Sequence, residues 1–356
     1  MAETTPPAQV GGSEGSPRRR RPLRNALIGL VACLVLLALV GAGVSWYLQD
    51  RLVDNVDRVD DAFTGLENRP APSSGGALNI LLMATDRRSD LPTTGEEAQA
   101  PTWLPGRQNS DALMVLHVDA DREGASIVSI PRDSWVTIPG RGASKVNAAF
   151  SMAGPSLAVE TVESITDLRI DHLAVVDWSG FRALTDELGG VTVTVPQTVH
   201  DPLRDKTWEA GEHRLDGDDA LRYVRQRYGL PAGDLDRVKR QQNVLRALMH
   251  QTLASGATRN PVKAYGILDT LTDHLTVDAE WTTGDMRDLV LSMRGLRASD
   301  VVFTTAPVRG LGREGDESVV YLDRDKGREL WGAVREDRAQ EWLEANPGAE
   351  LPSSVS

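Results

Sequence analysis

Six cationic side chains lie within one short stretch of the chain, "ALRYVRQRYGLPAGDLDRVKRQQ", residues 220–242. They are Arg222, Arg225, Arg227, Arg237, Lys239 and Arg240. The chain as a whole is acidic, with a formal net charge of -12. A local cluster of this kind is typical of a solvated helix face, a nucleic-acid surface or a pocket for a multiply charged phosphate.

A second set of charged residues lies at the ends of three successive predicted strands. Asp86 and Arg88 follow the first strand, Asp111 precedes the second, and Arg132 and Asp133 follow the third. One charged residue after a strand is usually a loop residue in contact with water, but three such sites favour a common ligand, because ligands of α/β sheets bind beyond strand ends. Two carboxylates can hold one Mg²⁺, and arginines can bind pyrophosphate with two parallel hydrogen bonds.

Several kinds of site are excluded by what the sequence lacks. It contains no G-x-x-x-x-G-K-[ST], G-x-G-x-x-G, G-x-S-x-G or H-E-x-x-H motif. The six histidines are scattered without a ligand-like spacing, and Cys33 is the single cysteine, which excludes an intramolecular disulfide and a cysteine-based zinc site. The net acidity argues against a general nucleic-acid binder, which usually carries a basic face.

The elements that must position these residues alternate between strands and helices. Buried strands are predicted at residues 78–85, 112–118, 125–130, 172–178 and 191–195. A helix is predicted within residues 144–166, with Pro155 suited to a first helical position, and another follows Ser179 as its N-cap. This alternation predicts an α/β layered domain. Residues 260–345 are predicted to form two or three more helices around a strand at 300–308.

The basic stretch itself is predicted to form two helices. The first covers residues 216–228 and stops at Gly229; the second is capped by Asp234 and places Arg237 and Gln241 on one face. On an ideal helix Arg225 and Arg227 point about 200° apart. If both bind one ligand, the first helix must unwind near Gln226.

The N-terminal part of the chain predicts a membrane anchor. Residues 1–25 form a disordered cytoplasmic tail, residues 26–48 a single transmembrane helix, and residues 49–69 an amphipathic helical stalk followed by a linker over 70–76. The arginines that precede the apolar span place the N-terminus in the cytoplasm and the remainder outside the cell membrane. A cleaved signal peptide is the alternative, although the span is long for one. The domain core is expected at 77–255, a C-terminal extension packed on it at 256–345, and a disordered tail at 346–356.

The order of these segments resembles the LytR-CpsA-Psr family of cell-envelope proteins. "NILLMATDRRSD", "NSDALMVLHVD" and "SIPRDSWVTIPG" are similar to the family's strand-end motifs, and "RLDGDDALRYVRQRYGLPAGDLDRVKRQQNVL" is similar to its arginine-rich segment. The resemblance covers about residues 77–255. One position departs from the family pattern, because Asn109 stands where the family has Arg, and Arg107 is a candidate to supply that charge.

The resemblance implies a central mixed β-sheet between helical layers. It implies a phosphotransferase that moves an anionic glycopolymer from a polyprenyl-pyrophosphate carrier, a lipid of the membrane, to peptidoglycan. The reaction would depend on Mg²⁺, with Mn²⁺ as a substitute ion. A pyrophosphatase side activity is also implied. No nucleic acid is expected as a partner. The metal ligands implied by motif position are Asp86 and Asp111. The residues expected to hold the pyrophosphate or act on it are Arg88, Arg107, Arg132, Asp133, Lys145, Arg225, Arg227, Asp234, Arg237 and Gln241.

Two questions stay open at this stage. Either Asp133 or Asp234 can serve as the base for the acceptor hydroxyl. The alternative is a non-catalytic envelope protein that binds polyprenyl-phosphate lipids and has a regulatory role. A nucleic-acid binder that uses the basic stretch is a third, which the external location of the domain disfavours.

Overall fold

A computed structural model describes residues 57–87, 93–94, 98, 101–106, 108–254, 260, 266, 269, 273–352 and 354–355. For Asp86, Arg87 and Gln108 it describes the backbone only. The predicted cytoplasmic tail and transmembrane helix lie outside these residues. Among the described residues, no helix is long and apolar enough to cross a membrane.

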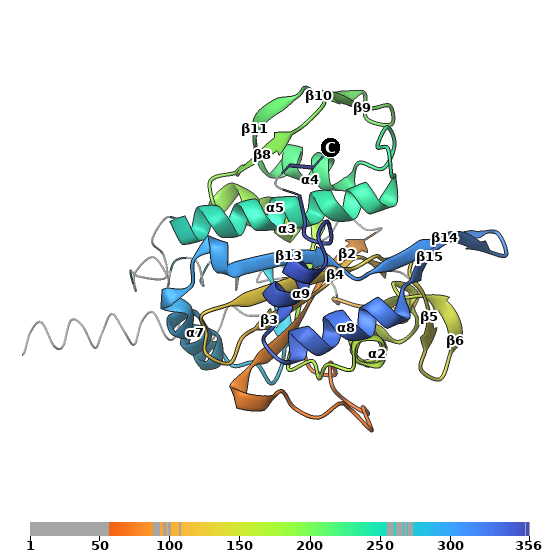
Figure 1. Cartoon of the computed structure of the whole chain (residues 1–356), viewed down its shortest axis with the longest axis vertical. Helices are drawn as coiled ribbons and strands as arrows, with labels where there is room; N and C mark the ends of the chain where they lie inside the picture. Colours follow the sequence, from red (N-terminus) through yellow and green to blue (C-terminus); the bar gives the residue numbers. More distant parts are fainter. Residues whose placement is uncertain are drawn as a thin grey trace, which may run out of the picture. The chain divides into compact units, whose positions relative to one another are not determined.

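A seven-stranded mixed sheet forms the centre of the described domain (Figure 1). Its strands, in spatial order, are β1 (Asp57–Val59), β12 (Thr276–Asp278), β7 (His172–Asp177), β2 (Leu78–Arg87), β3 (Gln108–Val118), β4 (Ala125–Ile130) and β13 (Val301–Thr305). β3 runs antiparallel to both of its neighbours, whereas β2 pairs in parallel with β7 and β4 in parallel with β13. The carboxyl ends of β2 and β4 therefore meet the amino end of β3 at one edge of the sheet.

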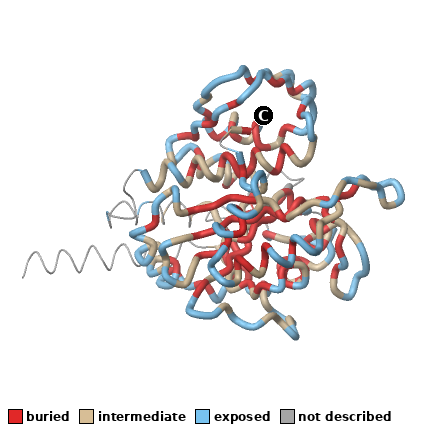
Figure 2. The backbone as a smooth tube through the Cα atoms, in the orientation of Figure 1, coloured by how far each residue is buried: buried red, intermediate tan, exposed pale blue. Residues whose placement is uncertain are grey.

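Helices cover both faces of the sheet, as the sequence predicted. Leu81 and Met83 of β2 pack in the core cluster that contains α2 (Ala148–Thr166), α8 (Arg324–Arg335) and α9 (Ala339–Ala345). The alternate residues Ile80 and Leu82 pack in clusters with α7 (Thr283–Ser292) and α5 (Asp234–Ala254). Figure 1 shows α5 and α2 on opposite sides of the strands, and Figure 2 shows the buried backbone concentrated between them.

A second, smaller core holds the basic stretch in place. It joins α3 (Trp178–Glu187), α4 (Gly217–Arg225) and α5 to the paired strands β8 (Val191–Val195) and β11 (Gly211–Leu215). A further hairpin, β9 (Val199–Asp201) with β10 (Lys206–Trp208), lies beside them. Trp208 and Tyr223 are buried there edge to face, with ring centroids 5.4 Å apart.

Two hairpins that the sequence analysis did not predict lie beyond the end of β4. They are β5 (Trp135–Ile138) with β6 (Gly142–Lys145), and β14 (Val308–Glu314) with β15 (Glu317–Leu322). A β-bridge between Ser134 and Val320 connects them. Short 3₁₀ turns at Ser74–Gly76, Met293–Gly295 and Ala298–Asp300 complete the described elements.

Local predictions hold at most element positions, with two adjustments in the helices. α2 is broken at Ala153 and Gly154, where Gly154 has a φ of 76°, and Pro155 begins the second segment as predicted. The N-cap of α3 is Asp177 rather than Ser179. The Asp177 carboxylate accepts hydrogen bonds from both Gly180 N (2.8 Å) and the Ser179 hydroxyl (2.7 Å). Asp177 therefore caps the helix, and Ser179 lies inside its first turn.

Three predicted boundaries are wrong. The helical stalk is absent over its described part, because residues 57–59 form β1 and pair with β12. Residues before 77 are therefore part of the domain, and Arg69 binds buried Glu163 at 2.7 Å. The C-terminal segment is not a disordered tail, since Leu351 is buried and its N–H bonds to Phe303 O at 2.8 Å. In each case apolar side chains of a short segment complete a core that no local pattern reveals.

Candidate active site

The predicted convergence of strand ends is confirmed. In the antiparallel register of β2 and β3, Asp86 lies opposite Asn109 and Thr85 opposite Ser110, whereas Ala84 lies opposite Ala112. Asp111 is thus the extra residue of a β-bulge, a feature that re-aims side chains beside active sites. The side chain of Asp86 and all of Arg88 and Arg107 lie outside the described residues.

The Arg132 side chain lies near three carboxylates at this end of the sheet, those of Asp111, Asp133 and Asp234. Its Nη1 donates to the Asp111 carboxylate, which is only 8% exposed. Its Nε lies 3.8 Å from Asp133 Oδ2 and 3.9 Å from Asp234 Oδ1. Burial lowers the pKa of the Arg132 guanidinium, but the carboxylates of Asp111, Asp133 and Asp234 outweigh it and raise the pKa overall. Arg132 therefore stays fully charged inside the protein.

Arg237 brings a second buried guanidinium from the first turn of α5. It is 6% exposed and its Nη2 lies 2.6 Å from Asp234 Oδ1. This contact lacks the alignment of a hydrogen bond, so Nε and Nη2 of Arg237 are buried without a hydrogen-bond acceptor among the described residues. Burial, and the nearby charge of Arg132, lower the pKa of Arg237. A bound anion would satisfy these donors and offset the repulsion between the two guanidiniums.

The first helix of the basic stretch is shorter than predicted. α4 stops at Arg225, and Gln226 has extended dihedral angles, φ -63° and ψ 132°. The predicted continuation to residue 228 is therefore wrong, and Arg225 and Arg227 both line one cavity instead of pointing apart. The break is fixed by the buried Gln226 side chain, which accepts from Arg240 Nη1 (2.6 Å) and donates to Tyr228 O (2.9 Å).

The other cations of the stretch have structural roles. Arg240 is fully buried and lies 4.1 Å above the ring of Tyr223. Arg222 pairs with Asp219 at 2.8 Å and Lys239 with Asp236 at 3.3 Å. The six cations thus separate into a pocket set and a scaffold set.

The pocket set surrounds a cavity of about 220 Å³, which we call the phosphate pocket. It is lined by Asp111, Arg132, Trp178, Leu203, Arg204, Val224, Arg225, Arg227, Tyr228, Arg237 and Gln241. Lys145 is not among its lining residues. It lies at the rim of the acid cluster, 3.4 Å from Asp133 Oδ1 and 3.2 Å from Glu317 Oε2 of β15.

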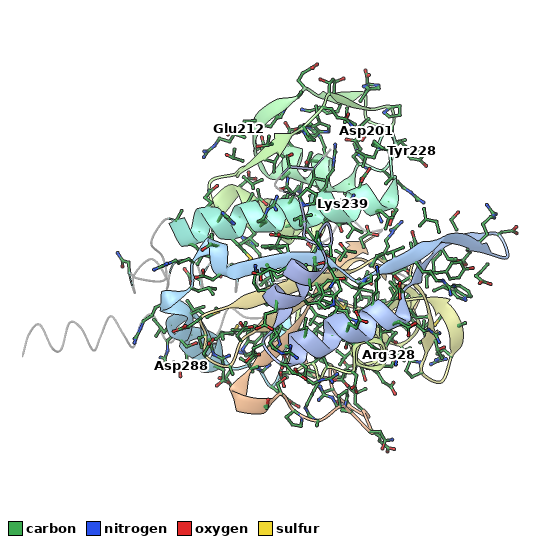
Figure 3. The ribbon with its side chains drawn as sticks, viewed as in Figure 1. Asp201, Glu212, Tyr228, Lys239, Asp288 and Arg328 are labelled. Atoms are coloured by element: carbon green, nitrogen blue, oxygen red, sulfur yellow. The ribbon has the colours of Figure 1, made fainter. Side chains whose placement is uncertain are left out.

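Sequence reasoning missed several pocket residues. The Arg225 guanidinium lies 5.4 Å above the ring of Trp178, which follows β7 directly, so the strand-end argument extended to this fourth strand would have found it. Arg204 and Leu203 come from the segment after β9, and no local pattern marks them. Tyr228 and Leu203 are the exposed apolar side chains at the pocket, and Figure 3 shows Tyr228 near the segment that holds Asp201.

The two predicted magnesium ligands come from adjacent strands. Asp86 is in β2 and Asp111 in β3, and one register pair, Thr85 with Ser110, separates them. Carboxylate oxygens are the ligands that Mg²⁺ prefers. Of the two, only Asp111 has a described side chain, and its carboxylate accepts from Arg132, so the magnesium ion stays a prediction.

The sheet and its helices define an α/β protein with an arginine-lined pocket at one end of the sheet. The chain matches the LytR_cpsA_psr family over residues 51–336 and belongs to this family. The cell wall biosynthesis protein LcpA of Corynebacterium glutamicum is 32% identical over 335 residues, which span 85% of this chain but only 63% of LcpA.

Two further proteins are similar to this chain, one by sequence and one by its solved structure. The polyisoprenyl-teichoic acid–peptidoglycan teichoic acid transferase TagU of Oceanobacillus iheyensis is 31% identical over 306 residues, 82% of this chain and 88% of that protein. The solved structure of a LytR-Csp2A-Psr enzyme from Actinomyces oris has a TM-score of 0.60 and 22% identity, and covers 78% of this chain and 95% of that one. This likeness confirms the predicted fold of a mixed sheet between helices.

Proposed function

We propose that this protein is a phosphotransferase that moves an anionic glycopolymer from a polyprenyl-pyrophosphate carrier to a hydroxyl group of peptidoglycan. The phosphate pocket carries the proposal: five arginines line one small cavity, and Arg237 there has buried donors without an acceptor among the described residues. A pyrophosphate offers the charge and the oxygen acceptors that these donors lack. The name of TagU, a transferase of teichoic acid from polyisoprenyl to peptidoglycan, supports the class of substrate.

The protein's own residues supply position and charge in this reaction. The acceptor hydroxyl attacks the phosphorus that carries the sugar, a P–O bond to the acceptor forms, and polyprenyl phosphate leaves with the bridging oxygen. Arg132 binds the pyrophosphate from the end of β4 and Arg237 from α5, while Arg225 and Arg227 bind it from the end of α4 and the segment after it. Such positioned cations are most of what phosphoryl transfer requires from a protein.

We assign the general base to Asp133. Asp234 lies 2.6 Å from Arg237 and 3.9 Å from Arg132, so it is paired closely with a guanidinium. Asp133 also lies between two cations but at longer distances, 3.4 Å from Lys145 and 3.8 Å from Arg132, so its carboxylate is the less tightly paired of the two. Asp86 and Asp111 would hold the Mg²⁺, or Mn²⁺ in its place. When bound, the ion neutralises charge that develops on the phosphoryl oxygens.

The membrane anchor over residues 26–48 belongs to the same proposal. It would place the pocket outside the cell membrane, where the lipid carrier presents its pyrophosphate. Nucleic acid has no part in this function, because the cations of the basic stretch either line the phosphate pocket or pair within the protein.

The test is transfer by the full chain in detergent, supplied with a polyprenyl-pyrophosphate glycan, a peptidoglycan acceptor and Mg²⁺. We expect a phosphodiester-linked product from the wild type and from Lys239→Ala, and none from Arg225→Ala or Asp111→Ala. Tight binding of the lipid without transfer or diphosphate cleavage, with Mg²⁺ or Mn²⁺, would refute the enzyme and favour the regulatory lipid-binding alternative.

A further inference from the structure

A second charged cluster lies at the other end of β3, away from the phosphate pocket. His117 is fully buried near the end of this strand, and Asp119 follows in the turn to β4. Asp337 reaches the same place from the turn between α8 and α9, where its backbone has a φ of 56°. His117 Nε2 lies 2.8 Å from Asp337 Oδ1 and 3.7 Å from Asp119 Oδ1. We call these three residues the histidine cluster.

The hydrogen bonds of Asn79 determine which nitrogen of His117 carries a proton. Asn79 Nδ2 donates to the carbonyl oxygen of Arg169 at 2.8 Å and to Ser73 Oγ at 2.9 Å. Because a carbonyl oxygen can only accept, this end of the amide is the nitrogen. Asn79 Oδ1 then faces His117 Nδ1 at 2.7 Å and must accept its proton.

This assignment leaves a conflict at the other ring nitrogen. In the neutral ring Nε2 has a lone pair and no proton, yet its neighbours are the carboxylates of Asp337 and Asp119, which also only accept. A second proton on the ring would resolve the conflict, and so would a metal ion between the three groups.

We propose that the histidine cluster binds one Zn²⁺ ion through His117 Nε2 and one oxygen each of Asp119 and Asp337. The three ligand atoms all lie within 4.8 Å of one another. Adjacent ligands of a tetrahedral zinc ion are about 3.3 Å apart, given bonds of about 2.0 Å. The separations of 2.8 and 3.7 Å lie on either side of this value. Asn79 then has the role of the outer partner that fixes the tautomer and orientation of a metal-binding histidine.

The surroundings of the cluster fit a bound cation. The carboxylate of Asp121, in the same turn, adds negative charge beside Asp119 and Asp337. Gly124 leaves room for the Asp119 carboxylate, since a Cβ at this position would lie 2.2 Å from Oδ2. Asp119 and Asp337 also line a hollow of about 610 Å³, from which an ion can enter and a water can complete its shell.

The ligand set selects the class of metal. An imidazole nitrogen with two carboxylates suits zinc and similar transition metals, whereas Mg²⁺ and Ca²⁺ prefer oxygen alone. The ion would join the β3–β4 turn to the α8–α9 turn, two segments about 220 residues apart in the chain. Its role would be to stabilise this end of the sheet, and it does not depend on the proposed transfer activity.

The experiment measures zinc retained by the full chain in detergent after equilibration with ZnCl₂ in a metal buffer, by mass spectrometry of the metal. Asp119→Asn and Asp337→Asn each remove one charged ligand with almost no change in shape. Asp121→Asn is the matched control, because it makes the same change at an exposed residue of the same turn. Asp111→Asn reports any zinc held at the phosphate pocket.

We expect one tightly held equivalent of zinc in the wild type, in Asp121→Asn and in Asp111→Asn, and an affinity at least about 100-fold weaker in the two ligand variants. Circular dichroism shows whether each variant is folded. The proposal is wrong if the folded wild type binds no zinc at micromolar free ion. It is equally wrong if Asp119→Asn and Asp337→Asn bind as tightly as Asp121→Asn, or if Asp111→Asn alone loses the ion.

Discussion

The two ends of strand β3 carry opposite arrangements of charge. Near its beginning, Asp111 lies among the guanidiniums of the phosphate pocket. Near its end, His117 lies between the carboxylates of Asp119 and Asp337. The two sites are about 20 Å apart, at about 3.4 Å per residue along the strand. The first has cation donors in excess and suits an anion; the second has acceptors in excess and suits a cation.

The comparison shows what decides the role of a charged residue in this protein. Asp111 and Asp119 have the same side chain and lie on or beside the same strand. Asp111 contacts Arg132, a cation that also reaches Asp133 and Asp234. Asp119 has a histidine and two acids near it. The neighbours from other elements, rather than the residue type, therefore set the sign of the ligand that each end can bind.

The largest effect is expected from removing the central cation of the pocket. Arg132→Ala should lower the transfer rate about 10²- to 10³-fold, equivalent to about 3–4 kcal/mol of lost transition-state stabilisation. Initial rates with the lipid-linked glycan measure this loss. Arg222→Ala, which removes an exposed cation paired with Asp219, is the control and should retain the wild-type rate. A loss below about threefold in Arg132→Ala would contradict the assignment.

The opposite end of β3 should respond to metal instead. With zinc at about 100 times its dissociation constant, bound ion adds about 2.7 kcal/mol to the free energy of unfolding. This should raise the unfolding temperature of the wild type by about 5 °C. Asp119→Asn should lose the rise and Asp121→Asn should keep it in the same thermal scans. An equal rise in both variants would place the ion elsewhere.

A smaller effect should follow from disturbing the scaffold that shapes the pocket. Gln226→Ala removes the acceptor of the buried Arg240 Nη1 and the donor to Tyr228 O. The unsatisfied group should cost about 1–3 kcal/mol of stability, measured by urea unfolding. Gln340→Ala, at an exposed position of α9, should change stability by less than about 0.5 kcal/mol. Equal losses of stability in the two variants would show that the hydrogen bond between Gln226 and Arg240 does not hold the break after α4.

The smallest effect concerns the aromatic wall of the pocket. Trp178→Phe keeps a ring beside Arg225 but weakens the cation–π contact, which is worth about 0.5–1 kcal/mol. Affinity for inorganic pyrophosphate should fall about two- to fivefold in calorimetric titrations. Trp342→Phe, in the core on the other face of the sheet, should leave this affinity unchanged. The interpretation fails if Trp342→Phe weakens binding as much.

The sequence alone determined the features that depend on local pattern. Continuous apolar runs predicted β2 and β4, and the charged residues at three strand ends, Asp111 and Arg132 among them, were predicted to serve one ligand. The resemblance to the family's arginine-rich segment selected Arg225, Arg227 and Arg237 from the six cations, and all three line the pocket. The membrane span over residues 26–48 and the magnesium ion remain predictions from the same source. Local signals suffice for these because periodicity and strand ends are properties of neighbouring residues.

The tertiary structure decided whatever depends on contacts between distant segments. The end of α4 depends on Arg240, which reaches Gln226 from the next helix. β1 is a strand because β12 lies beside it, and Leu351 is ordered because the backbone of β13 accepts its N–H. His117 had no recognisable spacing in the sequence, since one of its partners lies 220 residues away. Such contacts gain their free energy only when the whole core assembles, so no stretch of sequence can encode them by itself.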